Sequence, residues 1–180
     1  MIALEDTEHV VRQAAVQAVV KVVGKTTDDI VIQRVLAKLK HEDRKIRAVV
    51  MEVLEGISLP GDQRIVHGMM EALVHPHAQV RKMAVGVIRS VAHKGDDLVL
   101  TSMADMLADA DADVRRAAVD AIKHLAEPNN ATAITSITRR LTSGEWFVRD
   151  AAQEVVFCGL VLMCCSILLP LLGAGSLKPK

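Results

Sequence analysis

The sequence predicts an all-α protein, a right-handed α-solenoid of about four and a half helix pairs with an apolar C-terminal helix. Three observations predict this fold class. A short pattern recurs five times at intervals close to 34 residues, and apolar residues within each copy follow helical spacing. Residues that break helices are few, since the chain has five prolines and ten glycines.

Three columns of residues in one register define the repeat. An arginine follows Val or Ile in every copy, at intervals of 35, 34, 34 and 34 residues: Arg12, Arg47, Arg81, Arg115 and Arg149. A leucine precedes each arginine by eight residues: Leu4, Leu39, Leu73, Leu107 and Leu141. Polar residues form the third column: Asp28, Asp62, Asp96 and Asn130. The predicted units therefore cover about 1–27, 28–61, 62–95, 96–129 and 130–156.

Each unit is expected to contain two helices. The first begins after the polar residue of the third column, whose side chain can cap the helix by accepting hydrogen bonds from first-turn amides. In the fourth unit this helix carries an apolar stripe of Val99, Leu100, Met103 and Leu107. The second helix begins with small residues and continues with larger apolar ones. Because neither stripe can be buried within one unit, neighbouring units must stack.

The five copies resemble the short form of the HEAT repeat family. The residues that carry the resemblance are "LEDTEHVVRQAA", "LKHEDRKIRAVV", "LVHPHAQVRKMA", "LADADADVRRAA" and "LTSGEWFVRDAA", and they extend over roughly residues 1 to 156. Tetratricopeptide and ankyrin repeats have similar periods, but this chain has no Tyr and no Thr-Pro-Leu-His sequence. The resemblance is specific for the fold and leaves the partner open.

The resemblance also implies a structural role for the arginines. In the family each arginine pairs with an aspartate six residues earlier, in a ladder of charge-assisted hydrogen bonds along the stack. Asp6 with Arg12 and Asp109 with Arg115 match this pattern. The other units carry His41, His75 and Ser143 in place of the aspartate. We therefore expect an incomplete structural ladder, formed by Asp6, Arg12, Arg47, Arg81, Asp109, Arg115 and Arg149.

Catalytic motifs are absent from the sequence. It contains no Gly-rich phosphate loop and no nucleophile elbow. The cysteines lie in an apolar run, which disfavours the reactive thiolate. We expect His41 and His75 to be solvated turn residues, because a metal site needs three or four converging ligands. The sequence thus predicts no catalytic, metal or cofactor-binding residues.

Protein binding is the remaining class of function. The resemblance implies that the second helices line a concave face. Basic residues seven apart share one side of two such helices: Lys82 with Arg89, and Arg116 with Lys123. They form a candidate basic patch, and an ordinary solvated face of mixed charge is the alternative. Trp146 is a further candidate contact.

Nucleic acid is a poor match for the composition. Lys and Arg together number 22, as do Asp and Glu, so the net charge is zero. The aromatic residues that stack on bases are scarce, with two Phe, one Trp and no Tyr. The expected partner is therefore another protein.

Residues 155–172 form an uncharged apolar run, and residues 173–180 form a short tail. Eighteen helical residues span about 27 Å, close to the thickness of a bilayer core. A membrane tail anchor is one interpretation, although Pro170 argues against it. The alternatives are a terminal helix packed on the array, a dimerisation surface and an artefact of gene assignment. The chain opens without a secretory signal, so we expect a cytoplasmic protein, with or without this anchor.

The main prediction is a non-catalytic scaffold that binds a segment of another protein along its concave helical face. One alternative is a tail-anchored adaptor that presents the repeats to the cytosol. A second, implied by the resemblance, is an enzyme subunit or lyase-like module of the kind that some short HEAT proteins form with tetrapyrrole-bearing partners.

Overall fold

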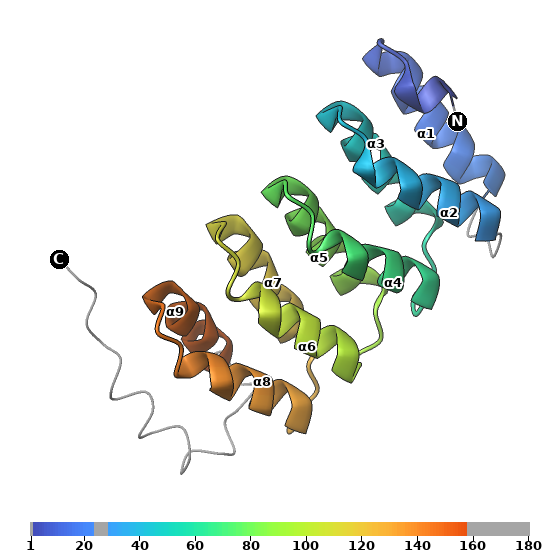
Figure 1. The fold of residues 1–180 in the computed structure, drawn as a ribbon. Helices are drawn as coiled ribbons and strands as arrows, with labels where there is room; N and C mark the ends of the chain where they lie inside the picture. Colours follow the sequence, from blue (N-terminus) through green and yellow to red (C-terminus); the bar gives the residue numbers. More distant parts are fainter. Residues whose placement is uncertain (1, 24–28, 158–180) are drawn as a thin grey trace. The chain divides into compact units, whose positions relative to one another are not determined.

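The structure is a computed structural model that describes residues 2–23 and 29–157. Within these ranges every regular element is helical and no strand occurs. The chain divides into two compact units, Met1–Ala92 and His93–Lys180. In each unit the helices form antiparallel pairs that lie side by side (Figure 1). The predicted fold class, an all-α solenoid of helix pairs, is confirmed.

The first unit has two layers of helices. Its elements are the 3-10 helix η1 (Ile2–Glu5), α1 (His9–Val23), α2 (Asp29–Ala37), the 3-10 helix η2 (Lys38–Lys40), α3 (Arg44–Ile57), α4 (Gln63–Ala72) and α5 (Ala78–Val91). Helices α2 and α4 contact each other in one layer, and α3 contacts both α1 and α5 in the other. The pairs α2/α3 and α4/α5 join the layers.

The second unit repeats this arrangement with two helix pairs. Its elements are α6 (Asp97–Met106), α7 (Ala112–Leu125), α8 (Ala131–Leu141) and α9 (Trp146–Val155). Helix α6 contacts α8, and α7 contacts α9. The stripe of Val99, Leu100, Met103 and Leu107 is fully buried, so the helical spacing in the sequence corresponds to the packed side of α6.

The helices recur with the period of the sequence. The first helices α4, α6 and α8 begin at Gln63, Asp97 and Ala131, and the second helices α5, α7 and α9 begin at Ala78, Ala112 and Trp146. Both series have intervals of 34 residues. Equivalent residues therefore occupy equivalent places in successive pairs, which is what a stacking repeat requires.

Polar side chains cap the first helices at the third column. Asp62 accepts a hydrogen bond from the amide of Arg64, Asp96 accepts from Leu98 and Val99, and Asn130 accepts from Ala133. These bonds satisfy amides that have no partner inside the helix. The remaining predicted cap, Asp28, lies outside the described residues.

The turn before each cap needs a residue in the left-handed conformation. Gly61, Gly95 and Asn129 adopt φ values of 80°, 76° and 63°. Glycine and asparagine tolerate this conformation better than other residues. The amide of Gly61 donates to the carbonyl of Val91, and that of Gly95 donates to Leu125. The turn thus also binds a carbonyl at the C-terminal end of α5 or α7.

Most of the apolar run 155–172 lies outside the described residues. The structure describes only Val155, Val156 and Phe157 of this run. Among the helices that the structure does describe, none combines the length and apolar character needed to cross a bilayer.

Candidate functional site

Each repeat arginine binds the main chain of its own turn. The Nη1 group of Arg115 donates to the carbonyls of Asp109 at 2.8 Å and Ala110 at 3.0 Å. Arg12, Arg47, Arg81 and Arg149 make the same two bonds, to the carbonyls six and five residues earlier. The arginines therefore fix the turn between the two helices of a pair, which gives them a structural role.

The residue six before each arginine also accepts a hydrogen bond within its own turn. The Oδ1 atoms of Asp6 and Asp109 accept the amides two residues later, at 2.9 and 2.8 Å. Within a turn, the arginine thus donates to the main-chain carbonyl of the aspartate and not to its side-chain carboxylate. The carboxylate is short enough to bond the nearby amide, as in other Asx turns. A ladder of side chains between units stays a prediction.

Histidine and serine perform the same task where the aspartate is missing. His41 Nδ1 accepts the amide of Asp43 at 3.0 Å, and His75 Nδ1 accepts that of His77 at 3.1 Å. Ser143 Oγ accepts the amide of Glu145 at 3.3 Å. This explains how units without the aspartate keep the same turn. Sequence reasoning missed the role, although the five residues stand in one column.

The surroundings of His75 favour its neutral form. Its pKa is lowered by burial and by the nearby charges of His77, Arg47 and Arg81. Because Nδ1 accepts a hydrogen bond, the neutral ring carries its proton on Nε2. His75 therefore presents one donor to its surroundings.

The basic residues singled out in the sequence lie on second helices in both units. Lys82 and Arg89 belong to α5 in the first unit, where Lys82 is half-buried and Arg89 is exposed. On α3 the exposed Glu52 and Glu55 add negative charge, and Glu52 accepts a hydrogen bond from Gln13 at 2.9 Å. The second helices of this unit thus carry both signs of charge.

In the second unit the basic residues have acidic partners. Arg116 of α7 forms an ion pair with Asp113 at 3.2 Å, and Lys123 pairs with Glu154 of α9 at 3.0 Å. Their charges are partly neutralised before any partner binds. The exposed side of these helices is accordingly a mixed surface and not a uniformly basic one.

Trp146 opens α9 and lies at a groove between α7 and α9. Its side chain is 48% exposed, and its ring meets Phe147 edge-on, with centroids 6.0 Å apart. The guanidinium of Arg115 lies 4.6 Å from the centre of the Phe147 ring, a cation–π contact. The groove has a volume of about 160 Å³. Its lining includes Arg116, Val119, Trp146, Phe147, Asp150 and Glu154.

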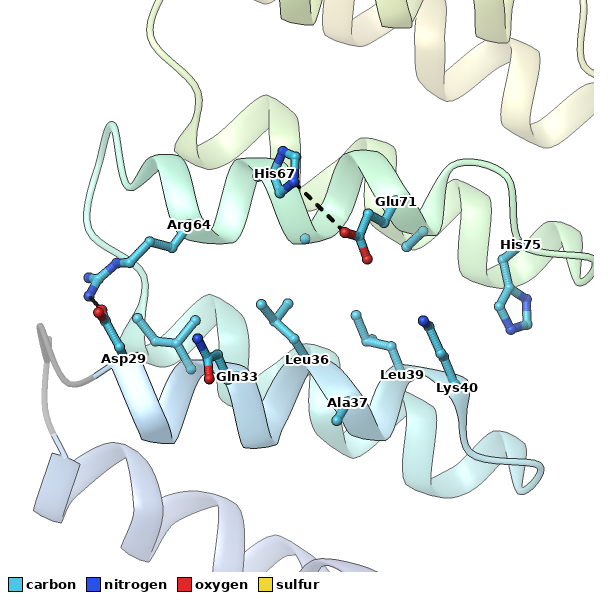
Figure 2. Close-up of a pocket in the computed structure, with 13 residues that line it drawn as sticks. Asp29, Gln33, Leu36, Ala37, Leu39, Lys40, Arg64, His67, Glu71 and His75 are labelled. Carbon is cyan, nitrogen blue, oxygen red and sulfur yellow. Dashed lines mark hydrogen bonds and ion pairs between the residues drawn. The ribbon is translucent and has the colours of Figure 1, made fainter.

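A larger groove lies between α2 and α4 of the first unit (Figure 2). Its volume is about 490 Å³. No motif in the sequence pointed to it, because its lining comes from two first helices and the turn after each of them. Among the described residues, no group of three or more His, Cys, Asp or Glu side chains is arranged to hold a metal ion in this groove or elsewhere.

Comparison with known proteins identifies the type of fold. Residues 32–123, half of the chain, match the family of HEAT repeats. An engineered protein of known structure is 16% identical, with 87% of this chain and 76% of that one covered and a TM-score of 0.51. The designed armadillo repeat protein YIII(Dq.V1)4CPAF, solved in complex with the peptide (KR)4, is 18% identical, with 86% and 78% covered and a TM-score of 0.51. Identities this low show the fold alone.

No curated protein matches the sequence. The 92 matched residues, the recurring 34-residue helix pairs and the arginine-bound turn nevertheless agree with one another. The chain belongs to the HEAT repeat family.

Proposed function

We propose that this protein is a non-catalytic scaffold that binds a segment of another protein along the exposed side of its second helices. HEAT and armadillo folds are typical of protein-binding scaffolds, and the designed armadillo neighbour holds a peptide. The observation that carries the proposal is the exposed Trp146 at the groove between α7 and α9. A large, half-exposed aromatic ring beside a groove is a common anchor in protein interfaces.

The surroundings of Trp146 make it a preorganised anchor. Phe147 supports the ring edge-on, and Arg115 stacks on Phe147. Arg115 is itself fixed by its two bonds to turn carbonyls. A ring held in this way loses little conformational freedom when a partner covers it, which favours binding.

Charged residues at the groove set the character of the partner. Asp150 is exposed and makes no ion pair within the part of the chain that the structure describes, whereas Arg116 and Glu154 are already paired. A partner segment with one apolar or aromatic residue for Trp146 and a cation for Asp150 fits this groove. On α5, Lys82 and Arg89 offer contacts for acidic residues of a partner.

Proximity labelling of the full chain in cells, followed by pull-down of the labelled proteins, tests the proposal. Trp146→Ala should weaken capture of the true partner about 30-fold, the effect of losing an interface hot spot. Leu98→Ala is the matched control, since Leu98 is an exposed apolar residue on a first helix of the same unit. Equal capture by both variants and the wild type would remove the groove from the proposal.

Charge reversal tests the basic residues separately. Lys82→Glu, Arg89→Glu, Arg116→Glu and Lys123→Glu should each weaken capture, with Arg139→Glu on α8 as the control for an exposed cation of a first helix. Exposed pairs contribute little individually, so we expect decreases of about two- to fivefold. If all four variants capture as the wild type does, these residues belong to an ordinary solvated surface.

A membrane-anchored form of the same scaffold is the second candidate, because residues 155–172 carry no charge. Carbonate extraction of the full chain, with a chain truncated after Glu154 as the control, tests it. Retention of only the full chain in the membrane pellet would support the anchor. Recovery of both chains in the soluble fraction would exclude it and leave the cytoplasmic scaffold.

A further inference from the structure

One close contact between helices distinguishes the groove between α2 and α4. The side chain of Leu36 on α2 lies directly against Gly68 on α4, where an added Cβ would come within 2.6 Å of Leu36 Cδ1. Ala104 and Ser136 hold the equivalent positions on α6 and α8, and those two helices contact each other more extensively. The contact of Leu36 with Gly68 is therefore a feature of the α2–α4 pair, and both residues line the groove.

The interior of this groove is apolar and of suitable size for a small molecule. Ile32 and Leu39 from α2 and η2, together with Ala72 from α4, are buried residues of its lining. The volume of about 490 Å³ falls in the usual range of ligand sites. The distance along the helices from Asp29 to Lys40 is about 17 Å, so the groove suits an elongated molecule.

One end of the groove is closed by charges that already satisfy one another. Arg64 of α4 forms an ion pair with Asp29 of α2, which bridges the two helices (Figure 2). Arg64 also pairs with Asp62 at 2.8 Å. A ligand finds little uncompensated charge there, so this end suits its apolar part.

The opposite end carries hydrogen-bond donors. Lys40 is exposed and makes no ion pair among the described residues, and His75 lines the same end of the groove (Figure 2). Because His75 Nδ1 already accepts the amide of His77, its Nε2–H is the donor that remains. The carboxylate of Glu71 also lines the groove, 3.8 Å from His67 Nε2. An ammonium and an imidazole N–H together suit an anionic group.

We infer that the α2–α4 groove binds a free single-chain carboxylate, with its apolar chain along Leu39, Leu36 and Ile32 and its carboxylate between Lys40 and His75. The ligand is an amphiphile because the two ends of the groove differ in charge and its middle is apolar. The site lies between first helices, and it is independent of the partner surface on the second helices.

Titration of the full chain with dodecanoate, followed by calorimetry, tests this site. The wild type should bind one equivalent saturably, and dodecanol, which lacks the anionic group, should bind about tenfold more weakly. Lys40→Ala should also weaken dodecanoate binding about tenfold, whereas Lys45→Ala, an exposed lysine on α3, should leave it unchanged. Absence of saturable binding, or equal binding of dodecanol, would overturn the inference.

Two variants that fill the groove test its position. Ala72→Leu places added carbons among the buried lining residues, and Gln33→Trp covers the opening from an exposed position on α2, where folding is less at risk. Either folded variant, checked by circular dichroism, should lose binding more than tenfold. Unchanged binding by a folded variant would place the ligand elsewhere. Sedimentation with vesicles of phosphatidylcholine and phosphatidylserine tests whether the groove binds membrane lipid instead. If the wild type sediments with the vesicles and Lys40→Ala does not, the groove belongs to membrane lipid, and the inference of a free carboxylate ligand is overturned.

Discussion

At the scale of residues, one position in the turn shows that different side chains can accept the same hydrogen bond. Asp6, His41, His75, Asp109 and Ser143 all accept the amide two residues later. What the position requires is a short side chain with an acceptor, and a neutral histidine meets that requirement. A histidine does so only while Nδ1 is unprotonated, which separates it from aspartate in two measurable ways.

The first difference concerns stability at neutral pH. In His75→Asp, the new carboxylate should accept the amide of His77 and also lie near the cations Arg47 and Arg81, which now disfavour a protonated His75. We expect the free energy of unfolding to rise by about 0.5–1 kcal/mol. Thermal unfolding at pH 7.5 should then show a Tm about 2–3 °C higher. A lower Tm would mean that the His75 ring contributes more by packing than by hydrogen bonding.

The second difference concerns acid. Because the pKa of His75 is lower in the folded protein than its ordinary 6.5, the unfolded chain takes up a proton first as the pH falls. This contribution to stability is fully present above pH 6.5 and is lost as the pH falls through 6.5 toward the folded pKa. Urea unfolding between pH 7.5 and 5 should show this loss in the wild type and a smaller one in His75→Asp. Identical pH profiles would exclude His75 as the source.

At the scale of elements, the packing of neighbouring helices depends on where small residues stand. Gly56 on α3 faces Val20 on α1 so closely that a Cβ would lie 2.5 Å from Val20 Cγ2. A Cβ added to Gly86 on α5 would meet nothing within 4 Å apart from the nearby backbone of its own helix. Both glycines lie in second helices, and helical propensity alone predicts that replacement by alanine stabilises the protein at each of them.

The two glycines should therefore respond in opposite ways to alanine. Gly56→Ala should lower the free energy of unfolding by about 1–3 kcal/mol, because the branched Val20 side chain has little freedom to move away. Gly86→Ala should raise it by about 0.5–1 kcal/mol through helix propensity. Urea midpoints of the two variants and the wild type provide the measurement. Stabilisation by both would show that α1 and α3 lie farther apart than described.

At the scale of the whole molecule, helix pairs depend on their neighbours for burial. In the second unit α6 packs on α8 as well as on α7, and α7 packs on α9. The apolar stripe of α6 is therefore covered by more than one helix. A pair taken from this array would expose much of that stripe to water.

An excised pair should accordingly fail to fold. We expect a peptide of residues 96–126, which contains α6 and α7, to show weak helical circular dichroism and no cooperative thermal transition. The full chain under the same conditions is the reference and should show strong helical signal. Cooperative unfolding of the peptide would contradict the dependence of each pair on its neighbours.

Much of this fold could be predicted from the sequence because a repeat states the same information several times. The columns of Arg115 and Asp96 mark the turns and the helix starts, and they recur at the period of the helices. The sites were less predictable. Trp146 was expected in a turn but opens α9, and the ion pair of Lys123 with Glu154 joins residues 31 apart.

The sequence by itself determined the all-α class, the 34-residue period and the polar residues that begin the first helices, because these follow from local spacing and capping. Only the tertiary structure decided which carbonyls the arginines bind, that Lys123 has an acidic partner on α9, and that a groove lies where Leu36 meets Gly68. The physical reason is that the last two features depend on distances between separate helices, and the first depends on the path of the main chain through the turn. No single column of the repeat contains this information.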